Sequence, residues 1–178
     1  MNKFIKNSVT PLAVGIVAAV LVFLDSLIAP LFLAGASFTW IAFVNWTVFF
    51  SSNGVERFKA IIGFIIGFIS ANAIVFIGNN LSNIIDIKLI NISIMSIFAV
   101  FLINLLVMYF DKAKKLFLDS IPGIFVGIAM TFSGAGQQLT VTSINLLGII
   151  IVYGILGLLC GLSTNFLVKK FNSRLEKK

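Results

Sequence analysis

Histidine is absent from this 178-residue sequence, and charged residues make up only 11% of it. Without imidazole, the chain has neither the commonest metal ligand nor the usual general acid or base. Cysteine occurs once, at Cys160, so no disulfide can form within the chain. A glycine-rich phosphate loop is also missing. We therefore expect no catalytic residue, no metal and no cofactor, and we do not expect an enzyme.

Apolar residues, by contrast, make up 60% of the sequence, and the mean hydropathy is +1.13. A soluble domain is close to half apolar and about a quarter charged. The apolar runs are continuous, as at 60–77 and 144–160, whereas the strands of a membrane barrel alternate apolar and polar residues. Within lipid, a helix pairs its own backbone groups. The composition therefore predicts an all-α membrane protein.

Six transmembrane helices are expected, because about 20 helical residues cross a hydrocarbon core about 30 Å thick. The predicted second and fifth spans are only about 15 residues long, which makes them short for this thickness. Together the spans would form a single transmembrane domain over residues 1–178. They are Thr10–Ala34, Ser37–Ser51, Phe58–Ile77, Leu89–Phe110, Ile121–Ala135 and Ile144–Val168.

Basic residues are distributed unevenly among the predicted loops. If the N-terminus is cytoplasmic, twelve of the thirteen lysines and arginines lie on the cytoplasmic side, and only Lys88 lies outside. Loops rich in Lys and Arg face the cytoplasm in membrane proteins, and an odd number of spans would break the pattern. Six spans with both termini in the cytoplasm are therefore predicted. The net charge of +7 then indicates contact with anionic lipid headgroups, and not binding of nucleic acid.

The two halves of the chain resemble each other, which predicts an internal repeat with units 10–79 and 89–168. In the third and sixth spans, residues 62–72 align with 156–165, and each segment carries a Gly-x-x-x-Gly pair. Three spans per unit would insert the second unit upside down, as in transporters whose substrate site lies between inverted repeats. Chance similarity between apolar sequences is the alternative. At an offset of 82, the identical pairs are Phe43/Phe125, Val44/Val126, Phe50/Phe132, Ser51/Ser133 and Gly54/Gly136.

The second and fifth spans are the predicted pore segments, because short, glycine-interrupted segments at matching positions mark transporter sites. Their polar side chains either line a wet path or hydrogen-bond to neighbouring helices, and Phe50 and Phe132 are candidates for a hydrophobic constriction. Trp40 also fits an interfacial anchor. The pore candidates are Trp40, Asn45, Thr47, Phe50 and Ser51 in the second span, and Pro122, Gly123, Phe125, Gly127, Thr131, Phe132 and Ser133 in the fifth.

Asp25 is a further candidate, because it lies past the middle of the first span. An ionised carboxylate there costs roughly 2.5–3.5 kcal/mol. Pro30 frees the carbonyl of Ser26 beside it, so the carboxylate either binds a proton or cation or simply packs the bundle. Asp119, at the start of the fifth span, fits an ordinary helix cap. Close helix packing, within the bundle or between subunits, is expected at Gly63, Gly67, Gly157 and Gly161.

The segment 121–136 reads Ile-Pro-Gly-Ile-Phe-Val-Gly-Ile-Ala-Met-Thr-Phe-Ser-Gly-Ala-Gly. Its Pro-Gly-x-Phe-x-Gly run, followed by Thr-Phe and small residues, resembles the signature of domain of unknown function family 1097. Residues 40–54, aromatic and followed by a basic turn, resemble that family's second span. The resemblance implies a multi-pass protein of the bacterial inner (cytoplasmic) membrane and implies no activity. It makes Pro122, Gly123, Phe125, Gly127, Thr131, Phe132 and Gly134 the defining positions.

The function that the sequence favours is passage of a small solute. The leading hypothesis is a channel or uniporter, assembled as a homo-oligomer, with its path between the second and fifth spans. A proton-coupled secondary transporter that uses Asp25 is one alternative. A non-transporting scaffold or regulatory subunit is the other.

Overall fold

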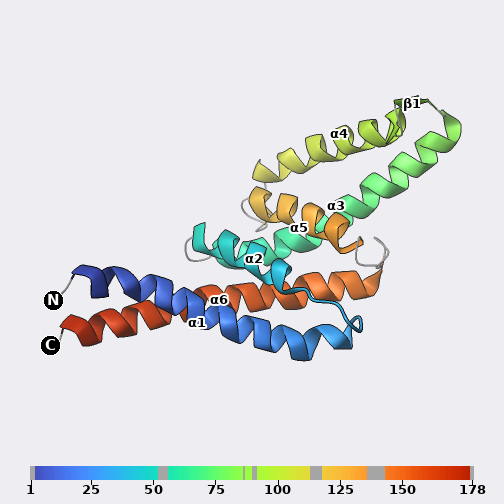
Figure 1. The fold of residues 1–178 in the computed structure, drawn as a ribbon. Coiled ribbons are helices and arrows are strands. Elements are labelled where there is room, and N and C mark those ends of the chain that lie inside the picture. The colour runs from blue at the N-terminus through green and yellow to red at the C-terminus, as the bar shows by residue number, and fades with distance from the viewer. Residues whose placement is uncertain are drawn as a thin grey trace. The chain divides into compact units, whose positions relative to one another are not determined.

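The computed structural model describes residues 3–51, 56–85, 87–89, 92–112, 118–135 and 143–176. Side chains are described at 8–49, 58–85, 87, 93–110, 118–135 and 143–174. Six α-helices make up most of this described part, so the protein is all-α, as predicted (Figure 1). A short antiparallel strand pair, β1 (Lys88–Leu89) with β2 (Ile92–Ser93), accompanies the helices.

The chain forms two compact units. Unit 1 consists of Met1–Ser52 and Val152–Lys178, and unit 2 consists of Asn53–Ile151. The longest helix, α6 (Ile144–Glu176), contributes its first turns to unit 2 and the remainder to unit 1.

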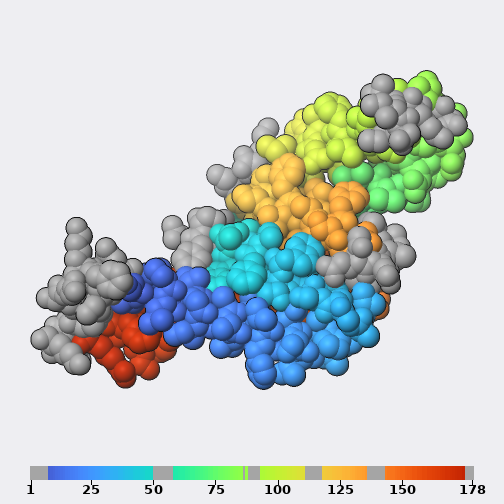
Figure 2. All heavy atoms as spheres, in the orientation of Figure 1, coloured from blue at the N-terminus to red at the C-terminus, as the bar shows by residue number. Residues whose placement is uncertain are grey.

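Unit 1 contains α1 (Lys3–Ile28), α2 (Thr39–Ser51) and most of α6. A 3₁₀ turn, η1 (Ala29–Leu31), follows α1 and has Pro30 in its first positions, where a missing N–H leaves no hydrogen bond unmade. Gly35 then adopts a φ of 77°, a left-handed conformation that favours glycine. In this unit α1 and α6 lie side by side (Figure 1), and the outer side of α1 is exposed (Figure 2).

Unit 2 contains α3 (Glu56–Ile84), α4 (Ile94–Met108), the 3₁₀ turn η2 (Tyr109–Lys112) and α5 (Ile121–Ala135). The hydroxyl groups of Ser82 and Ser93 share a hydrogen bond of 2.6 Å, which joins the end of α3 to the start of α4. Ser93 also caps α4 by accepting the N–H of Met95. Helices α4 and α5 both pack against α3, and one buried hydrophobic cluster of the unit consists of Ile74, Ile103, Val107 and Ile124.

The six predicted spans correspond to the six helices, but several boundaries were wrong. Helix α1 covers Lys3–Ile28 instead of Thr10–Ala34, and α6 continues to Glu176 instead of ending at Val168. The third span continues to Ile84, because Asn80 and Ser82 donate side-chain hydrogen bonds to the carbonyls of Phe76 and Gly78, one turn earlier in the same helix. The fourth span begins at Ile94 instead of Leu89, because residues 88–89 pair with 92–93 as strands. The fifth span coincides with α5.

The helices fall into two length classes within the described residues. Ser8–Leu31, Phe58–Ile84 and Ile144–Arg174 are long and apolar enough to cross a membrane. Thr39–Phe49, Ile94–Met108 and Ile121–Ala135 are shorter apolar helices; crossing a bilayer core of about 30 Å takes roughly 20 residues. Together they indicate a multi-pass membrane protein. The expected shortness of the second and fifth spans is confirmed, and α4 is also short.

Candidate functional site

Asp25 lies near the end of α1, and its side chain is only 4% exposed. Its carboxylate accepts three hydrogen bonds within unit 1. The hydroxyl of Tyr153 donates to Oδ1 at 2.5 Å, the hydroxyl of Ser37 donates to Oδ2 at 2.6 Å, and the N–H of Phe38 donates to Oδ1 at 3.1 Å. The ring of Phe38 also packs edge-on against that of Tyr153. This cluster joins α1, the turn before α2, and α6.

The same carboxylate caps α2. The N–H groups at a helix start have no partner within the helix, and the helix dipole favours negative charge there. Asp25 supplies both an acceptor and a carboxylate just before Thr39, where α2 begins. These contacts supply hydrogen-bond donors to a buried carboxylate, as the interpretation in which Asp25 packs the bundle expects.

Sequence reasoning did not identify Tyr153 or Ser37 as partners of Asp25. A signal was present, since Tyr153 is one of only two tyrosines and lies within the sixth predicted span. A buried tyrosine hydroxyl usually finds a hydrogen-bond partner. The sequence alone does not show that this partner is 128 residues away.

In unit 1, α2 packs against α6 at Gly157. A Cβ atom on Gly157 would lie 2.7 Å from the carbonyl oxygen of Ala42, 2.7 Å from Cβ of Asn45 and 3.0 Å from the backbone nitrogen of Trp46. One turn further along, Gly161 lies against Phe49 and Trp46. Since the contacts advance in the same direction on both helices, α2 and α6 run parallel. Only glycine permits this approach of the two backbones.

In unit 2, α5 packs against α3 at Gly67. A Cβ atom there would collide with the carbonyl oxygen of Ile124, and would lie 2.6 Å from Cα of Gly127 and 2.7 Å from the backbone nitrogen of Ile128. A Cβ on Gly63 would lie 2.9 Å from the carbonyl carbon of Gly123. Helices α3 and α5 are therefore also parallel.

The two glycine contacts involve matching residues of the short helices. Gly67 meets positions 124, 127 and 128, whereas Gly157 meets positions 42, 45 and 46. The two sets differ by a constant 82, the offset found in the sequence alignment of the two short spans. The contacting atoms also match in type. They are a carbonyl oxygen at 124 and 42, a Cα or Cβ carbon at 127 and 45, and a backbone nitrogen at 128 and 46.

Asn45 is the most unusual polar residue of α2. Its side chain is fully buried, and neither its amide nitrogen nor its amide oxygen has a hydrogen-bond partner among the described residues. Leaving a buried polar group unpaired costs roughly 1–3 kcal/mol. Trp46 lies next to it, with its ring stacked on that of Phe43 at 5.8 Å between centroids. A buried amide of this kind is able both to donate to and to accept from a small polar solute.

The other pore candidates divide into buried and exposed positions. Thr131 is fully buried and donates to the carbonyl of Gly127 within its own helix. Thr47 is exposed and donates to the carbonyl of Val44. Trp40 is half-buried, and Pro122, Phe125, Phe132 and Ser133 are exposed. Gly54, Gly136 and the side chains of Phe50 and Ser51 lie outside the described part of the structure.

Asp119 forms an ion pair at the starts of α3 and α5. Nζ of Lys59 lies 3.1 Å from Oδ1 and 3.3 Å from Oδ2 of Asp119, and both side chains are about 10% exposed. From the sequence, Lys59 indicated only the topology and Asp119 fitted a helix cap, so this pairing was missed. Their separation by 60 residues explains why no local pattern indicated it.

Comparison with protein families gives one match. The family described as "Protein of unknown function (DUF1097)" matches residues 9–169, which include α2 to α5 and most of α1 and α6. The chain belongs to the DUF1097 family. This confirms the resemblance seen in the fifth span, and within this DUF1097 protein that signature segment is the helix that packs closely on α3. No curated protein and no solved structure matches the chain.

Proposed function

We propose that this DUF1097 protein is a small-solute channel or uniporter built from an inverted repeat of three helices. The observation that carries the proposal is the pair of equivalent glycine contacts, Gly67 on α5 and Gly157 on α2, at positions of the short helices that differ by 82 throughout. Inverted repeats with short helices at matching positions recur in secondary transporters.

The repeat units would exchange their third helices. In sequence order, α1, α2 and α3 form the first repeat and α4, α5 and α6 the second. In space, α2 packs on α6 within unit 1, and α5 packs on α3 within unit 2. Each unit thus combines two helices of one repeat with the last helix of the other. Such exchange packs each repeat against the other, in addition to the chain that joins them. A scaffold made of two independent hairpins would lack this packing.

The glycine contacts favour an alignment of α3 with α6 that is shifted by four residues from the sequence alignment. The alignment pairs Gly63 with Gly157, whereas the contacts make Gly67 the counterpart of Gly157. Four residues are close to one helical turn, so the same face of the helix is used in either register. Because glycines recur at a spacing of four residues, sequence comparison alone does not distinguish the two registers.

We assign the solute contacts to the exposed sides of the two short helices. Each helix buries one side against its long partner and leaves the other side open, as the exposures of Phe43 (37%) and Phe125 (40%) illustrate. These two residues are counterparts at the offset of 82. Asn45 lies instead on the side of α2 that packs against Gly157 of α6, where it is fully buried and has no hydrogen-bond partner among the described residues. The exposed polar side chains of the two helices, Thr47 and Ser133, are uncharged hydroxyls, which suit neutral or weakly acidic solutes.

Topology, location and assembly complete the proposal. Twelve cationic side chains on one side favour six spans with both termini in the cytoplasm, and the parallel packing of α3 with α5 and of α2 with α6 agrees with that order. The membrane would be the bacterial inner membrane. Since the glycine faces are occupied within the chain, a homo-oligomer would have to form through other surfaces, such as the exposed side of α1.

Flux into proteoliposomes tests the proposal. Purified protein would be reconstituted and challenged with osmotic gradients of urea, glycerol and small weak acids, with vesicle swelling followed by light scattering. At least one solute should enter faster than into protein-free vesicles. Val44→Trp, on the exposed side of α2, should slow that entry, whereas Leu105→Trp, exposed on α4, should not. Unchanged permeability for the whole panel, with stable co-purification of another protein, would support a scaffold instead.

A further inference from the structure

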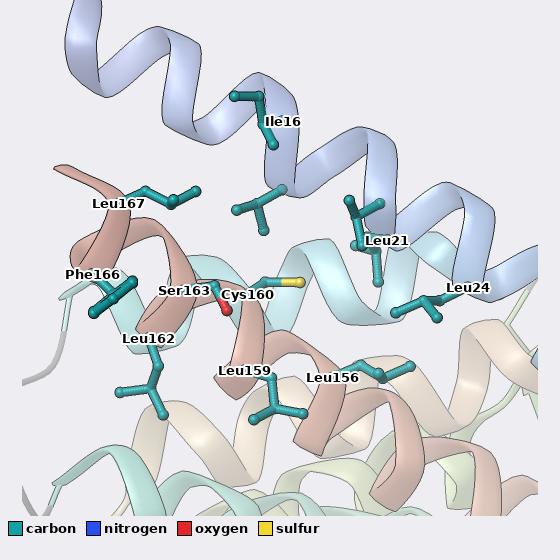
Figure 3. Close-up of a pocket in the computed structure, with 12 residues that line it drawn as sticks. Ile16, Leu21, Leu24, Leu156, Leu159, Cys160, Leu162, Ser163, Phe166 and Leu167 are labelled. Atoms are coloured by element: carbon teal, nitrogen blue, oxygen red, sulfur yellow. The ribbon is translucent and has the colours of Figure 1, made fainter. Parts of the chain in front are cut away.

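An apolar groove runs between α1 and α6 in unit 1. Its volume is about 650 Å³, within the range of roughly 300–1,000 Å³ typical of small-molecule sites. Ile16, Leu21 and Leu24 line it from α1, and Leu156, Ser163 and Phe166 are among the residues that line it from α6 (Figure 3). Ser163 and Cys160 are the only lining residues with a polar side-chain atom. The lining therefore suits an apolar group.

The length of the groove matches half a bilayer. Its lining on α6 extends from Leu156 to Leu167, which at 1.5 Å per residue is about 16 Å. One leaflet occupies half of a hydrocarbon core about 30 Å thick, or roughly 15 Å. At one end, the lining residue Leu24 is followed in the sequence by Asp25, which accepts a hydrogen bond from Tyr153.

The other end carries positive charge on the same face of α6. Lys170 follows Ser163 by seven residues and Phe166 by four, and Arg174 follows Lys170 by four, so both lie in line with the groove. Nζ of Lys170 lies 5.6 Å from the centre of the Phe166 ring, which lines the groove. Lys170 and Arg174 are exposed. Lys169 is also exposed. Because each residue of a helix turns by about 100°, Lys169 points roughly 110° away from the middle of the groove-lining face.

We infer that the groove binds one acyl chain of an anionic phospholipid, whose phosphate headgroup contacts Lys170 and Arg174. The apolar lining excludes a polar ligand, the leaflet-sized length fits an acyl chain, and the cations at the open end select a negative headgroup. Under the proposed topology the lipid belongs to the cytoplasmic leaflet. The site itself does not depend on solute passage.

A fluorescence-quenching experiment tests this inference. The full chain, with Cys160→Ala and a fluorophore on Ser163→Cys, would be reconstituted in phosphatidylcholine. Spin-labelled phosphatidylglycerol or spin-labelled phosphatidylcholine would then be added at the same mole fraction. Phosphatidylglycerol should quench more strongly. Either Lys170→Gln or Arg174→Gln should lower that preference about fivefold, the change expected from roughly 1 kcal/mol per cation, whereas Lys169→Gln should retain it.

Three outcomes would overturn the inference. Equal quenching by the two lipids would mean a lipid-facing surface without a selective site. An equal loss of the phosphatidylglycerol preference with Lys169→Gln would mean that general surface charge, and not a site aligned with the groove, attracts the lipid. Absence of quenching by both lipids, together with disulfide cross-linking of Ser163→Cys between copies, would mean that a second protein chain fills the groove. A fluorophore on Phe101→Cys, exposed on α4, provides the reference for unselective lipid contact.

Discussion

Tyr153 and Asp25 are 128 residues apart in the sequence and share a hydrogen bond in unit 1. Tyr153→Phe removes one of three donors to a buried carboxylate, so it should lower the free energy of unfolding by roughly 1–3 kcal/mol. Thermal melting in detergent measures the effect. Ser173→Ala is the control, because that exposed hydroxyl donates to the carbonyl of Lys170 in its own helix, and the variant should melt close to the wild type. A Tyr153→Phe protein with unchanged melting would show that the hydrogen bond contributes nothing.

Asp25→Asn separates a structural role from proton coupling. Because the carboxylate caps α2 and accepts three hydrogen bonds, the variant should be less stable but should retain solute flux per folded molecule. The measurement is solute flux with and without an imposed pH gradient. Each flux is divided by the fraction of protein that is folded. Loss of only the gradient-driven component would instead assign Asp25 to proton coupling.

Gly67→Ala and Gly157→Ala should destabilise the protein to a similar extent. A Cβ at either position would lie within 2.7 Å or less of backbone atoms in a short helix, and overpacking of this kind costs typically 1–3 kcal/mol. Gly15→Ala is the matched control, because a Cβ there meets nothing within 4 Å, and it should be neutral or slightly stabilising. Unfolding in SDS titrations compares the three variants. A tolerated Gly157→Ala with a disruptive Gly67→Ala would argue against equivalent packing in the two units.

The ion pair of Lys59 with Asp119 should couple the starts of α3 and α5. Removing one partner leaves the other charge largely buried, which costs about 3 kcal/mol. Lys59→Met and Asp119→Leu should therefore each lower stability, and the double variant should lose less than the sum of the two. Lys169→Met, at an exposed position, is the control. Strictly additive effects in the double-mutant cycle would mean that the pair does not couple.

The sequence predicted the helices better than their partners. The fifth span coincided with α5, because a proline-glycine start and a small-residue end mark both boundaries. The fourth span was placed too early, because hydropathy does not distinguish the strand Lys88–Leu89 from a helix start. Partner choice is a long-range property. The pairing of α2 with α6 and of α5 with α3 depends on backbone approach at glycines, and sequence spacing alone does not show which helix faces them.

The pore candidates stay predictions, and the sequence indicated their helices but not their hydrogen bonds. Asn45 and Thr131 were selected from their positions in short spans, and both are buried. The bonding of the two residues differs, since Thr131 donates to Gly127 one turn earlier whereas the Asn45 amide has no partner among the described side chains and backbone. The sequence does not predict this difference. A threonine hydroxyl reaches a carbonyl of its own helix, whereas the hydrogen bonding of the longer asparagine side chain depends on neighbouring helices.

Cysteine labelling should reveal the proposed topology. In a Cys160→Ala background, Ile87→Cys lies beside β1 and is expected outside, whereas Ser173→Cys in the last turns of α6 is expected in the cytoplasm. A membrane-impermeant maleimide applied to intact cells should label Ile87→Cys at once and Ser173→Cys only after permeabilisation. Labelling of both sites, or of neither, in intact cells would contradict six spans with both ends inside.

The most direct test of the central claim is inhibition of flux by thiol modification at matched positions of the two short helices. In a Cys160→Ala background, a bulky water-soluble thiol reagent would be applied to proteoliposomes that carry Phe43→Cys or Phe125→Cys. Phe23→Cys and Phe101→Cys, which are exposed on α1 and α4, serve as controls. The account predicts that modification slows solute entry for both short-helix variants and leaves both controls unchanged. Solute entry that is unaffected at Phe43 and Phe125, or equally affected at all four sites, would contradict it.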